Sequence, residues 1–326
     1  MSRTLRLAAI DVGSNTIHLL LAGCRPGAAP RQLFRRREFV QLGLDVAATG
    51  RVGPEHLERA ARTLSGQVAE ARRKGALKLA VGATQALRAA ANGEEVAAVL
   101  AQRAGIPAVV VLGPAEEAQL AFAGATMALL PGTSTLLIDI GGASTQVALG
   151  PAGGSCSDHS LGLGSGSIAA LAAGDPPSSE EWRAMQRRVG ELIPDLVPPP
   201  PRTVALGTGG TITNLPRLLG REKGSALRLR DVEEVIEVFR ELPVSEIATR
   251  SGMDLERVRL CRGGALILAH LMDLLGLPSV RCSERGLRDG MVTGILLRGE
   301  DWWRPLERPA AGPEVVQAAR DALARR

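Results

Sequence analysis

Two short stretches of the chain combine an aspartate with glycines and small hydroxyl residues. They are residues 9–16, which contain Asp11 and Gly13, and residues 137–145, which contain Asp139. In each, an apolar run typical of a β-strand delivers the aspartate, a glycine-rich turn follows, and a second apolar run begins. Glycine lets a backbone approach a ligand, and turn amides can bind an anion beside a metal-binding carboxylate. The repeated pattern predicts a duplicated phosphate-binding domain, with phosphate and Mg²⁺ as natural ligands.

Length and composition limit the class of protein. The chain has 326 residues, 45% of them hydrophobic, which suffices for about two domains. A net charge of +5 favours anionic ligands without requiring nucleic acid. Aromatic residues make up 2% of the chain and Tyr is absent, so a surface that stacks on bases is not expected. We therefore predict no DNA or RNA partner.

Neither the cysteines nor the apolar segments indicate a special compartment. Four cysteines without paired spacing argue against a zinc site or a disulfide framework: Cys24, Cys156, Cys261 and Cys282. The longest apolar segment, residues 263–277, contains His270 and Asp273 and is typical of a core helix. Asp11 interrupts the first apolar run before it reaches signal-peptide length. We expect a cytoplasmic protein with no membrane partner; a homodimer is a possible assembly that the sequence does not decide.

The elements that must position the two turns alternate in type along each half. The first half continues with a strand over 31–42, a helix over 54–74, a strand over 77–81, a helix over 94–105, a strand over 108–112 and a helix over 114–129. The second half has strands over 134–140, 146–149, before Leu161 and over 202–206, helices over 232–240 and 255–275, a strand near Val280 and a helix to Leu297. This order predicts an α/β fold. An amphipathic helix over 313–326 is expected to pack on the first half.

Six stretches extend the pattern in a fixed order: residues 11–18, 83–93, 116–120, 139–142, 207–211 and 286–290. Together they resemble the exopolyphosphatase and guanosine pentaphosphate phosphatase family, within the actin and sugar-kinase superfold, over nearly the whole chain. The resemblance implies an α/β fold of two duplicated actin-like (ribonuclease H-like) domains with an interdomain cleft. The expected domains are 1–125, completed by a C-terminal helix at about 300–326, and 126–299.

The resemblance also implies the roles of individual residues. Glu117 would be the catalytic glutamate that orients or deprotonates the attacking water. Asp139, and Asp11 through water, would hold Mg²⁺. The phosphate-binding residues would be Gly13, Ser14, Asn15, Thr16, Arg88, Gly141, Gly142, Ala143, Ser144, Gly209, Gly210 and Arg257. His18 is expected to be packed or hydrogen-bonded, and Arg288 to cap a helix or to pair with Asp289.

The implied activity is Mg²⁺-dependent release of terminal phosphate from polyphosphate or from guanosine pentaphosphate. Relatives that degrade long chains often carry an added C-terminal region, so short to medium polyphosphate is expected. The chain departs from the family pattern at Gln146, where a glutamate is usual, at Ala143, where a glycine is usual, and at Gln41 with Leu44, where arginine and glutamate are usual.

These departures leave substrate choice open. The segment that ends at Gln146 also resembles the related apyrases, so a nucleoside tri- and diphosphate hydrolase is one alternative. A catalytically weak sensor that binds guanosine tetraphosphate or polyphosphate is another, because the changes would weaken metal binding. A sugar kinase of the same superfold is disfavoured, since compact members carry a clustered-cysteine zinc motif that the scattered cysteines do not supply.

Overall fold

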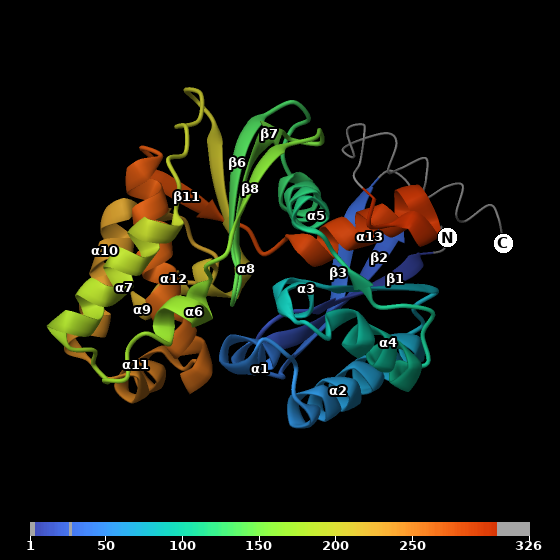
Figure 1. Cartoon of the computed structure of the whole chain (residues 1–326). Helices are drawn as coiled ribbons and strands as arrows, with labels where there is room; N and C mark the ends of the chain where they lie inside the picture. Colours follow the sequence, from blue (N-terminus) through green and yellow to red (C-terminus); the bar gives the residue numbers. More distant parts are fainter. Residues whose placement is uncertain (1–3, 26–27, 305–326) are drawn as a thin grey trace. The chain divides into compact units, whose positions relative to one another are not determined.

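The computed structural model describes residues 4–25 and 28–304 (Figure 1). These residues form two compact units. Unit 1 comprises the described residues up to Gly132, the segment Pro151–Cys156 and the described residues from Arg285 onward; unit 2 comprises Thr133–Gly150 and Ser157–Glu284. The helix predicted over 313–326 lies outside the described residues.

Unit 1 is built on a five-stranded sheet with the order β3-β2-β1-β4-β5. The strands are β1 (Leu5–Val12), β2 (Thr16–Arg25), β3 (Ala28–Phe39), β4 (Lys78–Ala83) and β5 (Val110–Val111). β1 is antiparallel to β2 and parallel to β4, and β4 is parallel to β5. The carboxyl ends of β1, β4 and β5 therefore meet at one edge of the sheet, where α/β proteins commonly bind ligands.

Unit 1 has seven α- and 3₁₀-helical segments in the described residues. They are α1 (Leu42–Thr49), α2 (Pro54–Arg73), α3 (Gln85–Ala89), α4 (Gly93–Ala104), α5 (Pro114–Thr126), α13 (Leu287–Arg298) and the 3₁₀ turn η1 (Gly299–Asp301). α2 buries Ala60, Leu64 and Val68 at helical spacing, as the sequence predicts.

α13 lies beside α5 (Figure 1). The approach requires glycine, because a Cβ on Gly290 would lie 1.8 Å from the carbonyl oxygen of Leu120. This close helix contact links α13 to α5 within unit 1. The division into domains 1–125 and 126–299 stays a prediction.

Unit 2 is built on a six-stranded sheet with the order β10-β11-β9-β6-β7-β8. The strands are β6 (Ser134–Ile140), β7 (Thr145–Pro151), β8 (Ser157–Leu161), β9 (Val204–Thr208), β10 (Leu227–Arg228) and β11 (Ser279–Cys282). β9 is parallel to both β6 and β11. Read from β8, this order repeats that of unit 1 with β10 added at the edge. The predicted duplication is present in the strand topology.

The helices of unit 2 enclose the larger hydrophobic core. They are α6 (Ser165–Ala169), α7 (Ser179–Leu192), α8 (Gly209–Ile212), α9 (Leu215–Leu218), α10 (Leu229–Glu241), α11 (Val244–Ser251) and α12 (Leu255–Leu274). α12 buries Cys261, Leu268 and Met272, which confirms the predicted core helix. Within the described part of the chain, no helix has the length and apolar character needed to cross a membrane.

Candidate functional site

The predicted site residues of unit 1 lie at or after the ends of neighbouring parallel strands. Asp11, near the end of β1, pairs with Gly82 on β4. The amide of Leu112, just after β5, donates to the carbonyl of Ala83 at the end of β4 at 2.8 Å. Arg88 on α3 and Glu117 on α5 follow β4 and β5 respectively. The sheet therefore brings residues that are distant in sequence to one edge.

The turn between β1 and β2 is held by its carbonyl groups. Gly13 donates its amide hydrogen to the carbonyl of Thr16 at 3.0 Å, and the carbonyl of Ser14 accepts from Gly43 in α1 at 2.8 Å. The carbonyl of Asn15 accepts two amides from the segment that connects β3 to α1. Within the described residues, the amides of Ser14 and Asn15 have no acceptor, and Nδ2 of Asn15 is buried without a partner. The turn thus presents donors suited to an anion.

The turn between β6 and β7 repeats this arrangement. Gly141 donates to the carbonyl of Ser144 at 2.9 Å, and the carbonyl of Gly142 accepts from Gly166 in α6 at 2.8 Å. As in unit 1, the amides of Gly142 and Ala143 donate to no other residue that the structure describes. Both predicted phosphate-binding turns therefore have the same hydrogen-bond pattern, and in each a helix amide donates to a carbonyl of the turn.

The second turn and α6 approach each other so closely that only glycine fits between them. A Cβ on Gly164 would lie 2.4 Å from the amide nitrogen of Ala143. The stretch 162–166 thus packs directly against the second turn. Ser165 adds a hydroxyl that donates to the carbonyl of Gly141 at 3.0 Å.

Asp11 has a mixed environment that suits a cation ligand. Burial raises the pKa of Asp11, and the charge of Arg288 opposes that shift. Nη1 of Arg288 lies 3.5 Å from Oδ2, whereas Oδ1 is buried without a hydrogen-bond partner in the described part of the chain. An unsatisfied buried carboxylate oxygen is costly unless a ligand supplies the missing contact.

Gln146 occupies in the second hairpin the position that His18 has in the first. His18 pairs with Asp11 across β1 and β2, and counting from Gly13 and Gly141 places Gln146 opposite Asp139 in the same way. Gln146 is 2% exposed; its Nε2 donates to Oγ of Ser160 at 3.0 Å, while Oε1 has no partner among the described residues. The departure from glutamate thus leaves a neutral oxygen acceptor beside the second turn.

These donors fit a magnesium ion. Mg²⁺ prefers carboxylate oxygens and keeps several water or phosphate ligands, and the orphaned Oδ1 of Asp11 is such a carboxylate oxygen. In the described ranges, no cluster of three or more His, Cys, Asp or Glu side chains could hold a metal. An ion bound at Asp11 or Asp139 would therefore take most of its ligands from water and substrate.

Glu117 is buried at the start of α5, where Pro114 occupies the first turn and Glu116 remains partly exposed. Oε2 of Glu117 accepts a hydrogen bond from Nη1 of Arg88 at 2.9 Å. Adjacent glutamates in a first helical turn commonly face water and interact with the helix dipole. Burial and the arginine partner distinguish Glu117 from that ordinary case.

In unit 2, the glycine-rich turn after β9 reaches Asp139. Gly209 has a φ of +92°, and a Cβ there would lie 2.9 Å from Oδ1 of Asp139. A Cβ on Gly210 would lie 2.4 Å from Nη1 of Arg257 on α12, so the guanidinium covers this turn. Of the predicted residues of unit 2, these four are therefore close neighbours.

One residue of the site was not assigned by the sequence. Arg288 was expected to cap a helix or to pair with Asp289, but its guanidinium faces Asp11, which lies 277 positions away. Only the motif over 286–290 could have directed attention to it, because spacing carries no information on so distant a contact. Thr16 contributes through its carbonyl, which closes the first turn.

Comparison with known proteins agrees with this geometry. The model of the Ppx/GppA phosphatase family matches residues 22–299. An uncharacterised protein of Streptomyces coelicolor is 30% identical, covering 93% of this chain and 94% of its own length. Exopolyphosphatase 2 of Mycobacterium tuberculosis is 29% identical, covering 89% and 98%.

The fold has a solved counterpart in the Ppx/GppA family member of Aquifex aeolicus. The two structures superpose with a TM-score of 0.75 at 23% identity, covering 91% of this chain and 99% of the other. The family match, the duplicated sheets and the paired turns together show that the chain belongs to the Ppx/GppA phosphatase family, has its two-domain actin-like fold and is an enzyme that hydrolyses phosphoanhydrides.

Proposed function

We propose that the protein releases the terminal phosphate of short to medium polyphosphate or of guanosine pentaphosphate, with Mg²⁺ as cofactor. The observation that carries the proposal is the repeated turn next to an aspartate. In the two turns, the amides of Ser14, Asn15, Gly142 and Ala143 donate to no described residue. Family membership and the likeness to an exopolyphosphatase support the same reading. Anionic phosphoryl oxygens would supply the missing acceptors.

The chemistry follows from the roles that these groups can play. Glu117 would accept a proton from water as the water oxygen bonds to the terminal phosphorus and the bridging P–O bond breaks. The products are inorganic phosphate and a substrate shorter by one phosphate. The turn amides would stabilise the charge on the phosphoryl oxygens, and Asp11 and Asp139 would hold Mg²⁺. When bound, that ion neutralises phosphate charge.

Gln146 supports a nucleotide hydrolase as the second candidate function. Its buried amide stands where a charged glutamate is usual in the family, and it keeps an oxygen acceptor, Oε1, beside the turn of unit 2. A site with one fewer carboxylate carries less negative charge against the substrate, which suits either a nucleotide or a short polyphosphate. The substrate panel below therefore includes ATP and ADP.

The test is phosphate release by the purified protein with Mg²⁺ from short and long polyphosphate, guanosine pentaphosphate, ATP and ADP. We expect release from short polyphosphate or guanosine pentaphosphate, and a loss of about 100-fold or more in Glu117→Gln, because an amide cannot accept the proton. Removal of divalent ions with EDTA should stop release, and Mg²⁺ should restore it.

An exposed residue of the same unit provides the matched control. Glu58 on α2 pairs with Arg103 and lies in no predicted site, so Glu58→Gln should keep full activity. Release from ATP and ADP alone would favour the nucleotide hydrolase. If no phosphate were released from any of the five substrates while one of them still bound, the protein would be a sensor and the proposed activity would be wrong.

A further inference from the structure

Arg88 uses its guanidinium within the protein. Nη1 donates to the carbonyl oxygen of Leu112 at 2.6 Å and to Oε2 of Glu117 at 2.9 Å. Nη2 donates to Oε1 of Gln85 at 2.7 Å. An arginine that clamps phosphate commonly presents Nη1 and Nη2 as a two-pronged fork. Since Nη1 has two hydrogens and two protein acceptors, Nη1 is not available as one prong of such a fork.

The acceptors of Arg88 come from three different elements. Gln85 lies on α3 itself, Leu112 lies just after β5, and Glu117 lies on α5. The guanidinium therefore fixes the distance between α3 and the start of α5. It also fixes the direction of the Glu117 carboxylate relative to the backbone of the preceding loop.

Burial strengthens the influence of this partner on Glu117. The residue is 9% exposed, and a buried carboxylate without a positive or hydrogen-bonding partner tends to lose its charge or to turn towards water. A general base must be charged and aimed at the water that it activates. The Arg88 side chain is itself mostly buried, so solvent screens the pair only weakly.

We propose that Arg88 is a positioning residue for Glu117, which holds the carboxylate in one rotamer for the attacking water, and that it does not present an Nη1–Nη2 fork to the transferred phosphoryl group. This inference rests on the proposed function, because it takes Glu117 to be the base. It reassigns Arg88 from the phosphate-binding role that the family resemblance implies.

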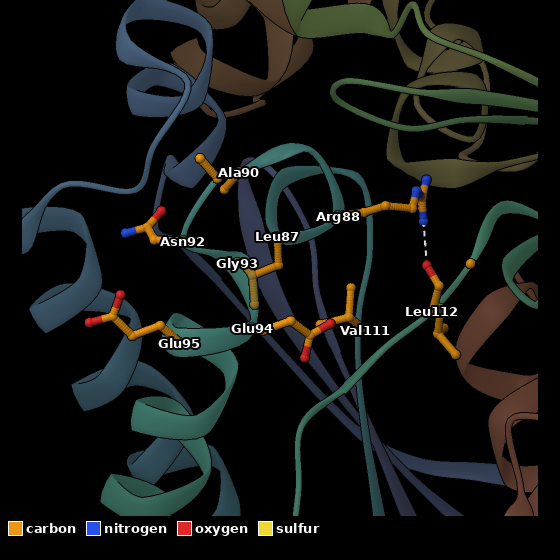
Figure 2. A pocket seen from close by; sticks show the side chains of 11 residues that line it. Leu87, Arg88, Ala90, Asn92, Gly93, Glu94, Glu95, Val111 and Leu112 are labelled. Carbon is orange, nitrogen blue, oxygen red and sulfur yellow. Dashed lines mark hydrogen bonds between the residues drawn. The ribbon is translucent and has the colours of Figure 1, made fainter.

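A pocket of about 400 Å³ lies beside Arg88 and offers a way to test the inference. It is lined by the loop between α3 and α4 and by the segment before α5, and Figure 2 shows Arg88 reaching the carbonyl of Leu112 at its border. Glu94 and Glu95, both exposed, add negative charge to the lining. Replacing Arg88 by alanine would enlarge this space, and the carboxylates would favour entry of a small cation.

The experiment measures kcat and KM for the wild type, Arg88→Ala, Arg88→Lys and the control Arg103→Ala. Arg103 is an exposed arginine of the same unit that pairs with Glu58. We expect Arg88→Ala to lower kcat about 100-fold and to change KM by less than about threefold. Added methylguanidinium should restore part of the kcat of Arg88→Ala, Arg88→Lys should keep an intermediate kcat, and Arg103→Ala should match the wild type.

The outcomes separate this inference from the proposed function. An active wild type whose Arg88→Ala variant shows a raised KM and an unchanged kcat would overturn the positioning role, because that pattern marks a lost ground-state ligand. A wild type that is inactive on every substrate would overturn the proposed function itself. If Arg88→Ala does not fold, as judged by its thermal unfolding, the ratio of kcat to KM effects in Arg88→Lys decides the same question.

Discussion

Buried polar atoms without partners cost about 1–3 kcal/mol each, and each unit has such atoms beside its turn within the described residues. In unit 1 they are Oδ1 of Asp11 and Nδ2 of Asn15, and in unit 2 the atom is Oε1 of Gln146. A ligand that satisfies the unit 1 pair must therefore offer both a donor or cation and an acceptor. A hydrated cation with a phosphate offers both.

A substitution at Gln146 tests the effect of a charge beside the turn between β6 and β7. In Gln146→Glu, the carboxylate would stand opposite Asp139, and two like charges at cross-strand positions repel. We expect a lower Tm than the wild type in EDTA and a larger rise in Tm when Mg²⁺ is added. Thermal unfolding with and without Mg²⁺ measures both, and an equal Mg²⁺ response in the two proteins would show that the ion does not contact this position.

Residue types and spacing predict the turns but not the contacts of the charged side chains. Gly13, Gly141 and Gly209 could be selected because glycine next to a strand end allows a close approach. By contrast, Arg88 binds Glu117, 29 positions away, and Arg288 faces Asp11 from the far end of the chain. Such pairs depend on how helices pack, which the local sequence does not encode.

At the scale of elements, α12 packs against the helices that support both glycine-rich loops of unit 2. A Cβ on Gly263 would lie 2.3 Å from the carbonyl oxygen of Ser165 in α6, and one on Gly264 would lie 2.0 Å from Cγ2 of Thr211 in α8. α6 holds the turn that contains Gly142, and α8 begins at Gly209. The two glycines therefore set how deeply α12 seats against the site.

Gly264→Ala should push α12 away from α8. We expect a loss of about 1–3 kcal/mol in the free energy of unfolding and a clear fall in kcat. The matched control is Gly66→Ala in α2, where a Cβ meets nothing within 4 Å; that change should leave activity intact and raise stability by up to about 1 kcal/mol. Denaturant unfolding and phosphate release measure both effects. Equal stability of the two variants would contradict the supporting role of α12.

The elements themselves were predictable where their periodicity is long. The helix over 54–74 matches α2, the strand over 134–140 matches β6, and the helix over 255–275 matches α12, each within one residue at either end. The short helices α1, α3, α6, α8, α9 and α11 were not predicted, because four to eight residues hold too few turns for a repeat to show. Several of these short helices support or carry the site residues.

At the scale of the whole molecule, the same turn is built twice from different residues. A Cβ on Gly13 would lie 3.2 Å from the carbonyl oxygen of Thr16, and one on Gly141 would lie 3.1 Å from that of Ser144. These carbonyls are fixed by the hydrogen bonds that close the turns, so Gly13→Ala and Gly141→Ala should cause matching losses of stability, of about 1 kcal/mol through overpacking, and each should lower kcat/KM. Activity retained after either change would mean that one unit suffices for catalysis.

The turn amides without an acceptor also allow ligand binding to be followed by amide hydrogen exchange. An amide proton held in a protein hydrogen bond exchanges with solvent only when the structure opens, whereas one without an acceptor can exchange from the closed state. The amide protons of Ser14, Asn15, Gly142 and Ala143 belong to the second kind among the described residues, although they lie in turns between paired strands. A bound anion converts them to the first kind, so their lifetimes in heavy water record occupancy of each unit separately, without a label and without turnover.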